Sequence, residues 1–348
     1  MRGLVLGGGG VKGSYQIGAY LAFKKCNMKI DGVVGTSIGA FNAAMLACGK
    51  DKELYKFWKN VDVGYLLGLN KNYVDSVNDK SLFKEFIYGL VQAKDILKSK
   101  GISSKKIKTA LDIMVNEKEL RNSSMDFGLV TVKVSKKTGF KPLYMFKEDM
   151  EEGKITEYIL ASCNLPVFKL EKMIDDSYYI DGGFYDTTPV KMLQEKGYDE
   201  IYVINLHGVG IYQKIKTKDD SVIVINPSKF LGSTLNVNKK QINDNIKLGY
   251  YDTLKVLKKL DGYNYIFKKK PLWYYNMRVK KIDKDLLLRV KKYFRAKDNK
   301  ELVLKALEYV MLKEDLTYFD IYKINLICRY AREYTTSKHF VYEFVRRL

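Results

Sequence analysis

The sequence predicts an α/β fold in which a central, mostly parallel sheet carries helices on both faces, followed by a helical C-terminal region. Over the first two hundred residues, short aliphatic runs alternate with segments of helical periodicity, as in sheets built from strand-helix-strand units. After about residue 238 the pattern turns helical. A chain of 348 residues with 46% hydrophobic content can bury a core of this size.

The expected strands and helices of the first part follow one another closely. Strands are expected at residues 4–6, 32–34, 127–134, 141–146, 178–180, 200–206 and 221–226. Helices are expected at residues 14–26, 40–49, 155–162 and 189–197. The strand segments are short and rich in β-branched, aliphatic or aromatic residues, which favours buried strands.

The C-terminal part shows four strong helical patterns and one interruption. Helices are expected at residues 242–260, 284–294, 301–314 and 324–334, and residues 262–276 are expected to be non-helical. We place a domain boundary near residue 260. Residues 1–260 then form the α/β domain, and residues 261–348 form a basic, mainly helical region.

Positive charge is concentrated in the C-terminal part. The chain has 61 Lys and Arg against 40 Asp and Glu, but residues 206–348 alone hold 31 against 15. Such a surface attracts polyanions, either nucleic acid or the anionic face of a membrane. A lysine-rich surface that is only solvated is the alternative.

Neither a signal peptide nor an apolar run long enough to span a bilayer is recognisable, so a cytoplasmic location is expected. The cysteines, Cys26, Cys48, Cys163 and Cys328, are far apart. Their spacing indicates neither a disulfide framework nor a zinc site, and most are expected to be small buried hydrophobic residues.

A serine between two glycines lies where the strand at 32–34 meets the next helix. Ser37 is flanked by Gly35 and Gly39 in the pattern Gly-x-Ser-x-Gly. A nucleophile on a strand-to-helix turn requires this context, because the glycines let the backbone turn steeply and the helix dipole stabilises developing negative charge. Ser37 is therefore a candidate nucleophile, and a small residue between two elements is the alternative.

A glycine run follows the first strand. Gly8, Gly9 and Gly10 offer unobstructed backbone N–H groups, as an oxyanion hole requires. With Gly13 they also fit the dinucleotide-binding pattern Gly-x-Gly-x-x-Gly. That alternative fits poorly, because the acid that would bind the ribose should end the second strand, whereas Asp31 precedes it.

The base that would activate Ser37 is not an obvious histidine. The chain has two histidines, His207 after the strand at 200–206 and His339 in the last helix, and both are expected to be structural or solvated. A Ser-His-Asp triad is therefore not favoured. Asp181 follows a short apolar run and precedes Gly182 and Gly183, although an Asp-Gly pair is usually just a turn.

Taken in order, four blocks resemble the patatin-like phospholipase family, over residues 2–205. They are the glycine run with Lys12 and Gly13, the Ser37 turn, the segment Ala-Ser-Cys-Asn-Leu-Pro at 161–166, and the Asp181 segment up to Pro189. The resemblance implies a three-layer α/β/α catalytic domain, a Ser37–Asp181 dyad, and an oxyanion hole made by the amides of Gly8, Gly9 and Gly10. It also implies that 161–166 is a helix end near the active site and that Pro189 starts a helix.

Two blocks depart from the family pattern. Lys12 stands where arginine is commoner, which weakens or redirects any role in phosphate recognition because lysine lacks the planar fork of arginine. Asp186-Thr187-Thr188-Pro189 replaces a pattern with asparagine two residues before the proline. Neither change affects the dyad.

The function that the resemblance implies is lipid acyl hydrolysis, of the phospholipase A or lysophospholipase type, through an acyl-serine intermediate. No cofactor and no metal are expected, and no acidic loop is spaced like an EF-hand. Another acyl ester or a thioester could be the substrate on the same dyad. A non-catalytic basic binding protein is a further alternative, and nucleic acid is not expected to be the partner.

A basic and aromatic segment at 265–281 suggests where such an enzyme would work. Its cations are Lys268, Lys269, Lys270, Arg278, Lys280 and Lys281, and its aromatics include Phe267, Trp273, Tyr274 and Tyr275. Aromatic and basic side chains together favour an anionic lipid surface. We therefore expect a peripheral location at the inner face of the membrane. The alternative is that the aromatics pack inward and the lysines stay solvated.

Overall fold

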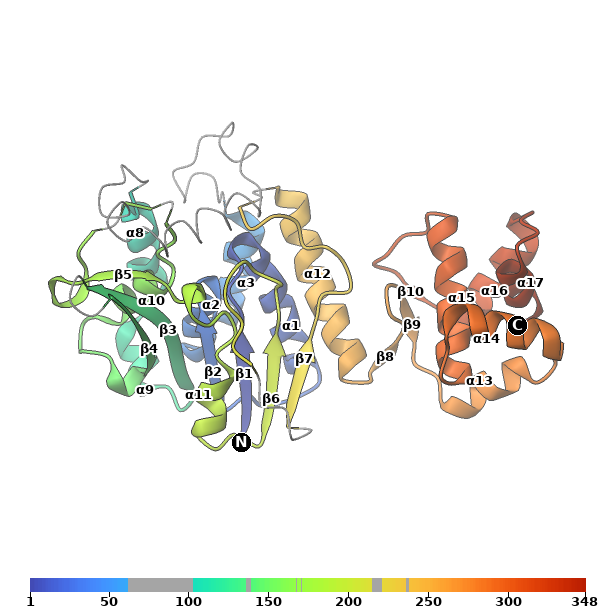
Figure 1. The fold of residues 1–348 in the computed structure, drawn as a ribbon, viewed down its shortest axis with the longest axis horizontal. Coiled ribbons are helices and arrows are strands. Elements are labelled where there is room, and N and C mark those ends of the chain that lie inside the picture. The colour runs from blue at the N-terminus through green and yellow to red at the C-terminus, as the bar shows by residue number, and fades with distance from the viewer. Residues whose placement is uncertain (62–102, 136–138, 167, 170, 215–220, 236–237) are drawn as a thin grey trace. The chain divides into compact units, whose positions relative to one another are not determined.

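The protein is described by a computed structural model, which covers residues 1–61, 103–135, 139–166, 168–169, 171–214, 221–235 and 238–348 (Figure 1). It divides into two compact units, Met1–Tyr250 and Tyr251–Leu348. The division lies inside helix α12 (Lys239–Val256), somewhat before the boundary expected at residue 260.

The N-terminal unit contains a seven-stranded sheet in the described part of the chain. Its strands are β1 (Arg2–Leu6), β2 (Gly32–Thr36), β3 (Asp126–Ser135), β4 (Gly139–Phe146), β5 (Tyr178–Asp181), β6 (Glu200–Ile204) and β7 (Val222–Ile225). The order is β4-β3-β2-β1-β6-β7, and β5 pairs with β3. Strands β3, β2, β1, β6 and β7 run parallel, whereas β4 and β5 are antiparallel to β3. The predicted strands and the mostly parallel α/β sheet are confirmed.

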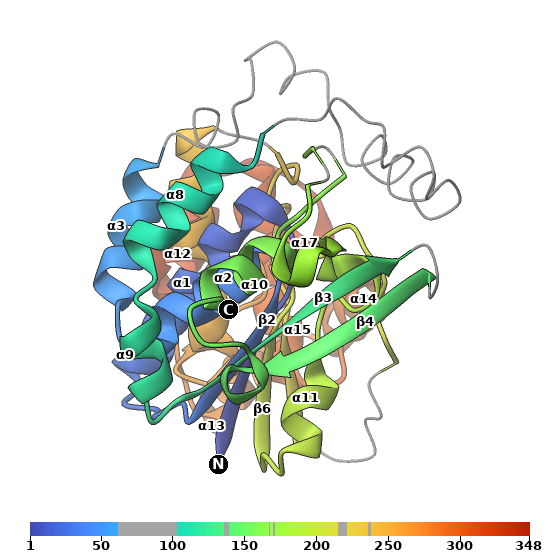
Figure 2. The same ribbon diagram turned by 90° about the vertical axis from the view of Figure 1, so that its left-hand side faces the viewer.

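Helices lie on both faces of this sheet (Figure 2). They are α1 (Ser14–Lys25), α2 (Ile38–Ala47), α3 (Asp51–Asn60), α8 (Lys105–Met114), α9 (Glu117–Asn122), α10 (Ile155–Ser162), α11 (Val190–Glu195) and α12. On one face, Val5, Val34 and Val203 pack with residues of α11. On the other face, Phe23 of α1 makes an edge contact with Tyr202 of β6. The sheet is therefore the middle of three layers.

Helices α3, α8 and α9 were not expected from the sequence. Each has a narrow apolar stripe, with Leu54 and Trp58 buried in α3, Leu111 in α8 and Leu120 in α9. Their remaining positions are largely charged or polar, and in α3 and α8 the apolar residues recur at helical spacing, so these two helices are amphipathic. They form because these few residues find partners in the folded unit.

The C-terminal unit is mainly helical, as predicted. Its elements are β8 (Leu260–Asp261), β9 (Ile266–Lys268), α13 (Leu272–Val279), α14 (Lys284–Phe294), α15 (Asn299–Lys313), β10 (Ile321–Tyr322), α16 (Ile324–Tyr334) and α17 (Phe340–Arg347). Helix α15 contacts α13, α14, α16 and α17, and its buried residues lie at the centre of this unit's core. None of the helices described here combines the length and apolar character needed to cross a bilayer.

The prediction that residues 262–276 are non-helical is wrong at their C-terminal end. Residues from Leu272 onward form α13. Pro271 precedes the helix with extended backbone, and a proline at this place is compatible with a helix start because its missing N–H would have no intrahelical acceptor. The aromatic residues that follow are therefore helical.

Candidate functional site

Ser37 lies on the turn between β2 and α2, in a conformation that non-glycine residues rarely adopt. Its φ is 57° and its ψ is −129°. The turn is tight on both sides of the serine, because a Cβ on Gly35 would lie 2.3 Å from the carbonyl carbon of Gly39, and one on Gly39 would lie 2.0 Å from the Leu6 oxygen. Strain of this kind is maintained at functional turns by the surrounding structure. The strand, turn and helix expected around Ser37 are present.

Asp181 ends β5 and is almost fully buried, with 2% of its surface exposed. Its Oδ1 accepts a hydrogen bond from the Gly183 amide at 2.7 Å, while its Oδ2 has no partner within 3.5 Å among the described residues. Burial raises the pKa of Asp181 to about 7, against smaller lowering effects of the Ser37 hydroxyl and the Gly183 amide. Ser37 and Asp181 are thus neighbours, and the open Oδ2 is a geometry that commonly tightens when substrate binds.

The end of helix α10 contacts both of these residues. The Ser162 hydroxyl accepts from the Ser37 amide at 3.0 Å and donates to the Val130 carbonyl at 2.6 Å. The Asn164 carbonyl accepts from the Asp181 amide at 2.9 Å. The expectation that segment 161–166 is a helix end near the active site is therefore met.

The glycine run of residues 8–10 lies beside Ser37, but its three amides are not equivalent. The Gly8 amide donates to the Thr187 carbonyl at 3.0 Å, so it is already occupied, contrary to its expected oxyanion role. Within the described residues, the amides of Gly9 and Gly10 have no acceptor, and neither has the amide of Ile38, which follows the nucleophile. Ile38 was missed in the sequence, although the residue after a nucleophile often contributes to the oxyanion hole.

The remaining motif residues hold the loops together. Gly13 ends the short 3₁₀ turn that begins at Gly10, and its carbonyl accepts from Asn42. The Gly182 carbonyl accepts from the amides of Tyr185 and Asp186. These contacts keep the glycine run and the aspartate loop in fixed positions near Ser37.

The two departures from the family pattern are buried. Lys12 is 3% exposed, and its Nζ lies 3.4 Å from the His207 carbonyl, so its ammonium group faces main chain and not solvent. Asp186 accepts from the Tyr144 hydroxyl and the Thr188 amide, and its carbonyl accepts from Thr36. The Thr36 bond ties the aspartate loop to the turn that holds Ser37.

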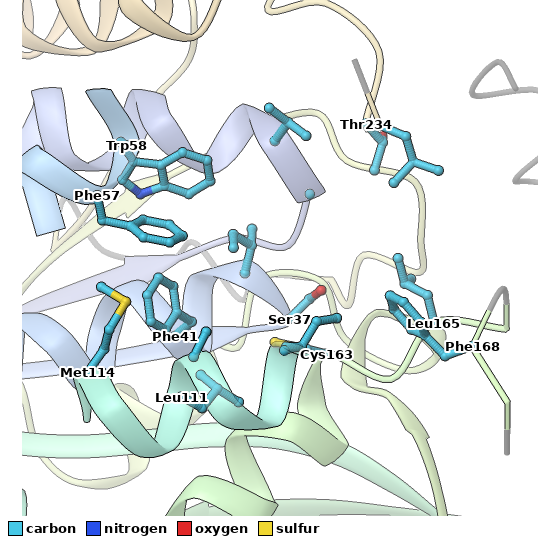
Figure 3. Close-up of a pocket in the computed structure, with 16 residues that line it drawn as sticks. Ser37, Phe41, Phe57, Trp58, Leu111, Met114, Cys163, Leu165, Phe168 and Thr234 are labelled. Atoms are coloured by element: carbon cyan, nitrogen blue, oxygen red, sulfur yellow. The ribbon is translucent and has the colours of Figure 1, made fainter. Parts of the chain in front are cut away.

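An apolar cavity of about 100 Å³ opens at Ser37. Figure 3 shows Ser37 between two groups of side chains. One group includes Phe41, Phe57, Trp58, Leu111 and Met114, and the other includes Leu165, Phe168 and Thr234. The lining is almost entirely hydrocarbon, and the serine hydroxyl and the Cys163 sulfur lie together in it. Such a lining suits an apolar group placed next to the serine hydroxyl.

Each histidine has contacts within its own unit. His207 is exposed, and its side chain contacts Asn205. His339 belongs to the C-terminal unit, where its Nδ1 accepts from the Val341 amide at the start of α17 and its ring stacks on Tyr309 and Phe340. Neither is recorded in contact with Ser37 or Asp181 among the described residues.

The cysteines are free, but only Cys328 is fully buried. Cys26, Cys48 and Cys163 are partly exposed, so the expectation that most are buried is wrong. Each lies at or just beyond a helix end, where packing is less complete than inside the sheet. In the described ranges, no three His, Cys, Asp or Glu side chains come close enough together to hold a metal ion.

The chain is similar in sequence to curated proteins. The chain is 24% identical over 208 residues to "Lysophospholipase nte1" of Aspergillus terreus and 27% identical over 214 residues to "Lysophospholipase NTE1" of Debaryomyces hansenii. These matches cover 60% of the chain but 12% of each relative, so the chain spans a small part of the curated relatives' length.

Two solved structures align with nearly the whole chain. VipD from Legionella pneumophila aligns with a TM-score of 0.44 and 15% identity, covering 99% of this chain and 83% of VipD. ExoU from Pseudomonas aeruginosa aligns with a TM-score of 0.38 and 13% identity, covering 99% of this chain and 68% of ExoU. The family model for patatin-like phospholipases matches residues 4–193, which is more than half of the chain. The protein therefore belongs to the patatin-like phospholipase family.

Proposed function

We propose that the protein is a lipid acyl hydrolase of the phospholipase A or lysophospholipase type, with Ser37 as nucleophile and Asp181 as its base. The observation that carries this proposal is one site in which a strained serine, a buried carboxylate and an apolar cavity meet. Membership of the patatin-like phospholipase family and the names of the lysophospholipase relatives support the same chemistry.

The reaction has two halves. In the first, Asp181 takes the proton of the Ser37 hydroxyl, the serine oxygen attacks the ester carbonyl, and the C–O bond to the alcohol breaks as Asp181 returns the proton to the leaving oxygen. This leaves an acyl group on Ser37. In the second, Asp181 takes a proton from water, the hydroxide attacks the acyl-serine, and the fatty acid leaves as the proton returns to Ser37.

The amides of Gly9, Gly10 and Ile38 are the proposed donors to the tetrahedral oxyanion. They are unoccupied in the described structure and lie at the glycine turn and at the N-terminus of α2. Preorganised donors of this kind are worth about 3 kcal/mol each in the transition state. The pKa of Asp181 near 7 also suits a base that works at neutral pH, because proton transfer is most effective when the pKa of the base is close to the working pH.

The proposed membrane contact is α13 with its flanking lysines. Phe267 and Tyr275 are fully buried, so for these two aromatics the inward-packing alternative is correct. Leu272, Trp273 and Met277 are each more than half exposed on α13. Exposed apolar residues beside Lys268, Lys269 and Lys270 would suit the headgroup layer of an anionic membrane, at its cytoplasmic face.

A fluorophosphonate probe and a lipid panel test the hydrolase. We expect the probe to label wild-type protein but not Ser37→Ala, and the panel to show release of fatty acid from lysophospholipid or diacyl phospholipid. Turnover of neutral lipid or a thioester alone would assign the dyad to another substrate. Failure of the probe to label folded wild-type protein would favour the non-catalytic binding protein.

Vesicle binding over a salt series tests the surface. We expect wild-type binding to require anionic lipid and to weaken as salt increases. Replacing Lys268, Lys269 and Lys270 by Gln should remove most of this dependence and leave hydrolysis of a soluble short-chain ester unchanged. The control replaces Lys52, Lys56 and Lys59, which are exposed on α3, and removes the same charge. Equal loss in both triple variants would show that net charge acts without a specific surface.

A further inference from the structure

The C-terminal turn of α10 contacts both residues of the proposed dyad through buried polar groups that the proposed mechanism does not use. Ser162 is 0% exposed and Asn164 is 4% exposed. They are separated by Cys163, which lines the apolar cavity beside Ser37 (Figure 3). Buried polar side chains cost folding free energy unless they are hydrogen-bonded, so the partners of these two residues show what their burial achieves.

Ser162 satisfies the amide of Ser37. An amide at this turn can join neither the parallel ladder of β2 nor the first intrahelical bonds of α2, and it would be left without an acceptor. The Ser162 hydroxyl oxygen supplies that acceptor, and the hydroxyl donates its own hydrogen bond to the Val130 carbonyl. Val130 is the residue of β3 that pairs with Thr36, so the hydroxyl braces Ser37 against the neighbouring strand.

Asn164 holds the other residue of the dyad. Its carbonyl accepts from the Asp181 amide, and its Nδ2 donates to the Tyr179 carbonyl at 2.8 Å. Strand β5 has four residues and pairs with β3. The two bonds from Asn164 therefore supply a second set of contacts that fixes the last residues of this short strand.

We propose that Ser162 and Asn164 are positioning residues that set the separation of Ser37 and Asp181 from one shared turn. This inference rests on the proposed function, because it assigns the two residues a role in the reaction of that dyad. Two anchors that are two residues apart move together, so the nucleophile and the base keep their relative position even if the cavity around them changes. Neither anchor touches the reacting atoms; each acts through the residue that it holds.

Ser162→Ala is the first test, with steady-state hydrolysis of a soluble short-chain ester between pH 5 and 9. We expect kcat to fall about 10- to 100-fold with KM changed less than about twofold, because the nucleophile is misplaced and substrate binding is not. The acidic limb of the pH profile should also move to higher pH. The Ser37 hydroxyl lowers the pKa of Asp181, and that effect weakens when the serine shifts.

Three further variants separate positioning from a general structural effect. Ser162→Thr keeps the hydroxyl and should recover most of kcat. Asn164→Ala removes the side-chain bond to the Tyr179 carbonyl but keeps the main-chain bond to Asp181, so it should shift the pH profile in the same direction with a smaller loss, about fivefold. Ser123→Ala is the control. It also removes a hydroxyl that accepts a hydrogen bond from a main-chain amide, but this hydroxyl lies outside the cavity, so kcat and the pH profile should not change. If Ser162→Ala does not fold, Asn164→Ala decides.

Combining Ser162→Ala with Asp181→Asn should give activity no lower than Asp181→Asn alone, since the anchor works only through the dyad. A wild-type kcat and pH profile in both Ser162→Ala and Asn164→Ala would overturn the positioning role. The positioning role would also be overturned if kcat fell together with thermal stability while the pH profile stayed unchanged, because that result indicates a general structural effect. If Ser37→Ala itself stays active, the proposed function fails, and that result is distinct from failure of the anchors.

Discussion

The two units of the protein each bury carboxylates, but they leave them in opposite states. In the N-terminal unit, Asp181 accepts one amide hydrogen bond and keeps an oxygen that has no partner in the part of the chain that the structure describes. In the C-terminal unit, Glu308 accepts from the amides of Tyr263, Asn264 and Tyr265. Asp261 accepts from the Lys270 amide, the Tyr275 hydroxyl and the Lys300 ammonium group.

This difference distinguishes a reactive carboxylate from a structural one. Burial raises the pKa of both Asp181 and Glu308, but main-chain amides occupy the oxygens of Glu308, whereas Asp181 keeps an oxygen that is open to accept a proton. Sequence position gives no hint of the difference, because Asp181 and Asp261 each precede a glycine. Asp181 and Asp261 are both buried, so their hydrogen-bond partners decide it.

The largest expected effect is on the dyad. Ser37→Ala and Asp181→Asn should each lower ester hydrolysis by about 10³-fold or more, and both together should be little worse than either, because the two residues act as one unit. Circular dichroism should show folded protein in each case. If Asp181→Asn keeps more than about a tenth of the wild-type rate, the base lies elsewhere, and the contrast between Asp181 and the carboxylates of the C-terminal unit no longer holds.

Glu308→Ala should act on stability and not on chemistry. It leaves the amides of residues 263–265 without their acceptor, which should cost about 3 kcal/mol in the unfolding free energy of the C-terminal unit. Urea unfolding measures this loss. Hydrolysis of a soluble short-chain ester should keep its wild-type kcat, and a fall of tenfold or more would show that Glu308 also serves the reaction.

Asp181→Asn should make the protein more stable at alkaline pH. The pKa of Asp181 is raised in the folded state, so its contribution to stability is present below the unfolded pKa of about 4 and is lost as pH rises through about 7. The neutral Asn avoids the ionised, buried form. We expect a gain of about 2 kcal/mol at pH 8.5 and little gain at pH 4.5, measured by thermal unfolding. The same gain at both pH values would contradict the raised pKa.

The cavity at Ser37 should set the length of the acyl chain. Leu111 lines it, and Leu111→Trp would fill part of the volume. We expect kcat/KM for long-chain esters to fall about tenfold while that for acetyl or butyryl esters changes little, because only the long chains need the filled space. Leu111→Met keeps the volume and is the control. Equal losses for short and long esters would mean that the chain binds elsewhere.

The smallest expected effect concerns the histidines. His207→Gln and His339→Gln, alone or combined, should change kcat less than about threefold, which corresponds to less than ~1 kcal/mol. Steady-state hydrolysis with the soluble ester measures this. A loss of 100-fold in His207→Gln would replace the dyad with a triad.

The sequence predicted the sheet well because each parallel strand carries its own signal, a short aliphatic run between turn residues. It also placed Ser37 on its turn, since strand, glycines and helix are contiguous. Local pattern could not reveal the bond between Ser162 and Ser37, whose positions are 125 residues apart. For the same reason it could not show that the Gly8 amide is occupied by Thr187 or that Tyr275 is buried while Trp273 is exposed.

The position of β1 in the sheet has a consequence for synthesis of the chain. Strand β1 lies between β2 and β6, and its residue Arg2 pairs with Glu200, which follows it by almost two hundred positions. A nascent chain that has left the ribosome only as far as residue 170 has the serine turn but lacks Asp181 and the strand that completes the bonding of β1. Long-range pairings of this kind close late in folding. If Ser37 and Asp181 act as the proposed dyad, the site is therefore complete only after the segments that carry Asp181 and β6 have left the ribosome.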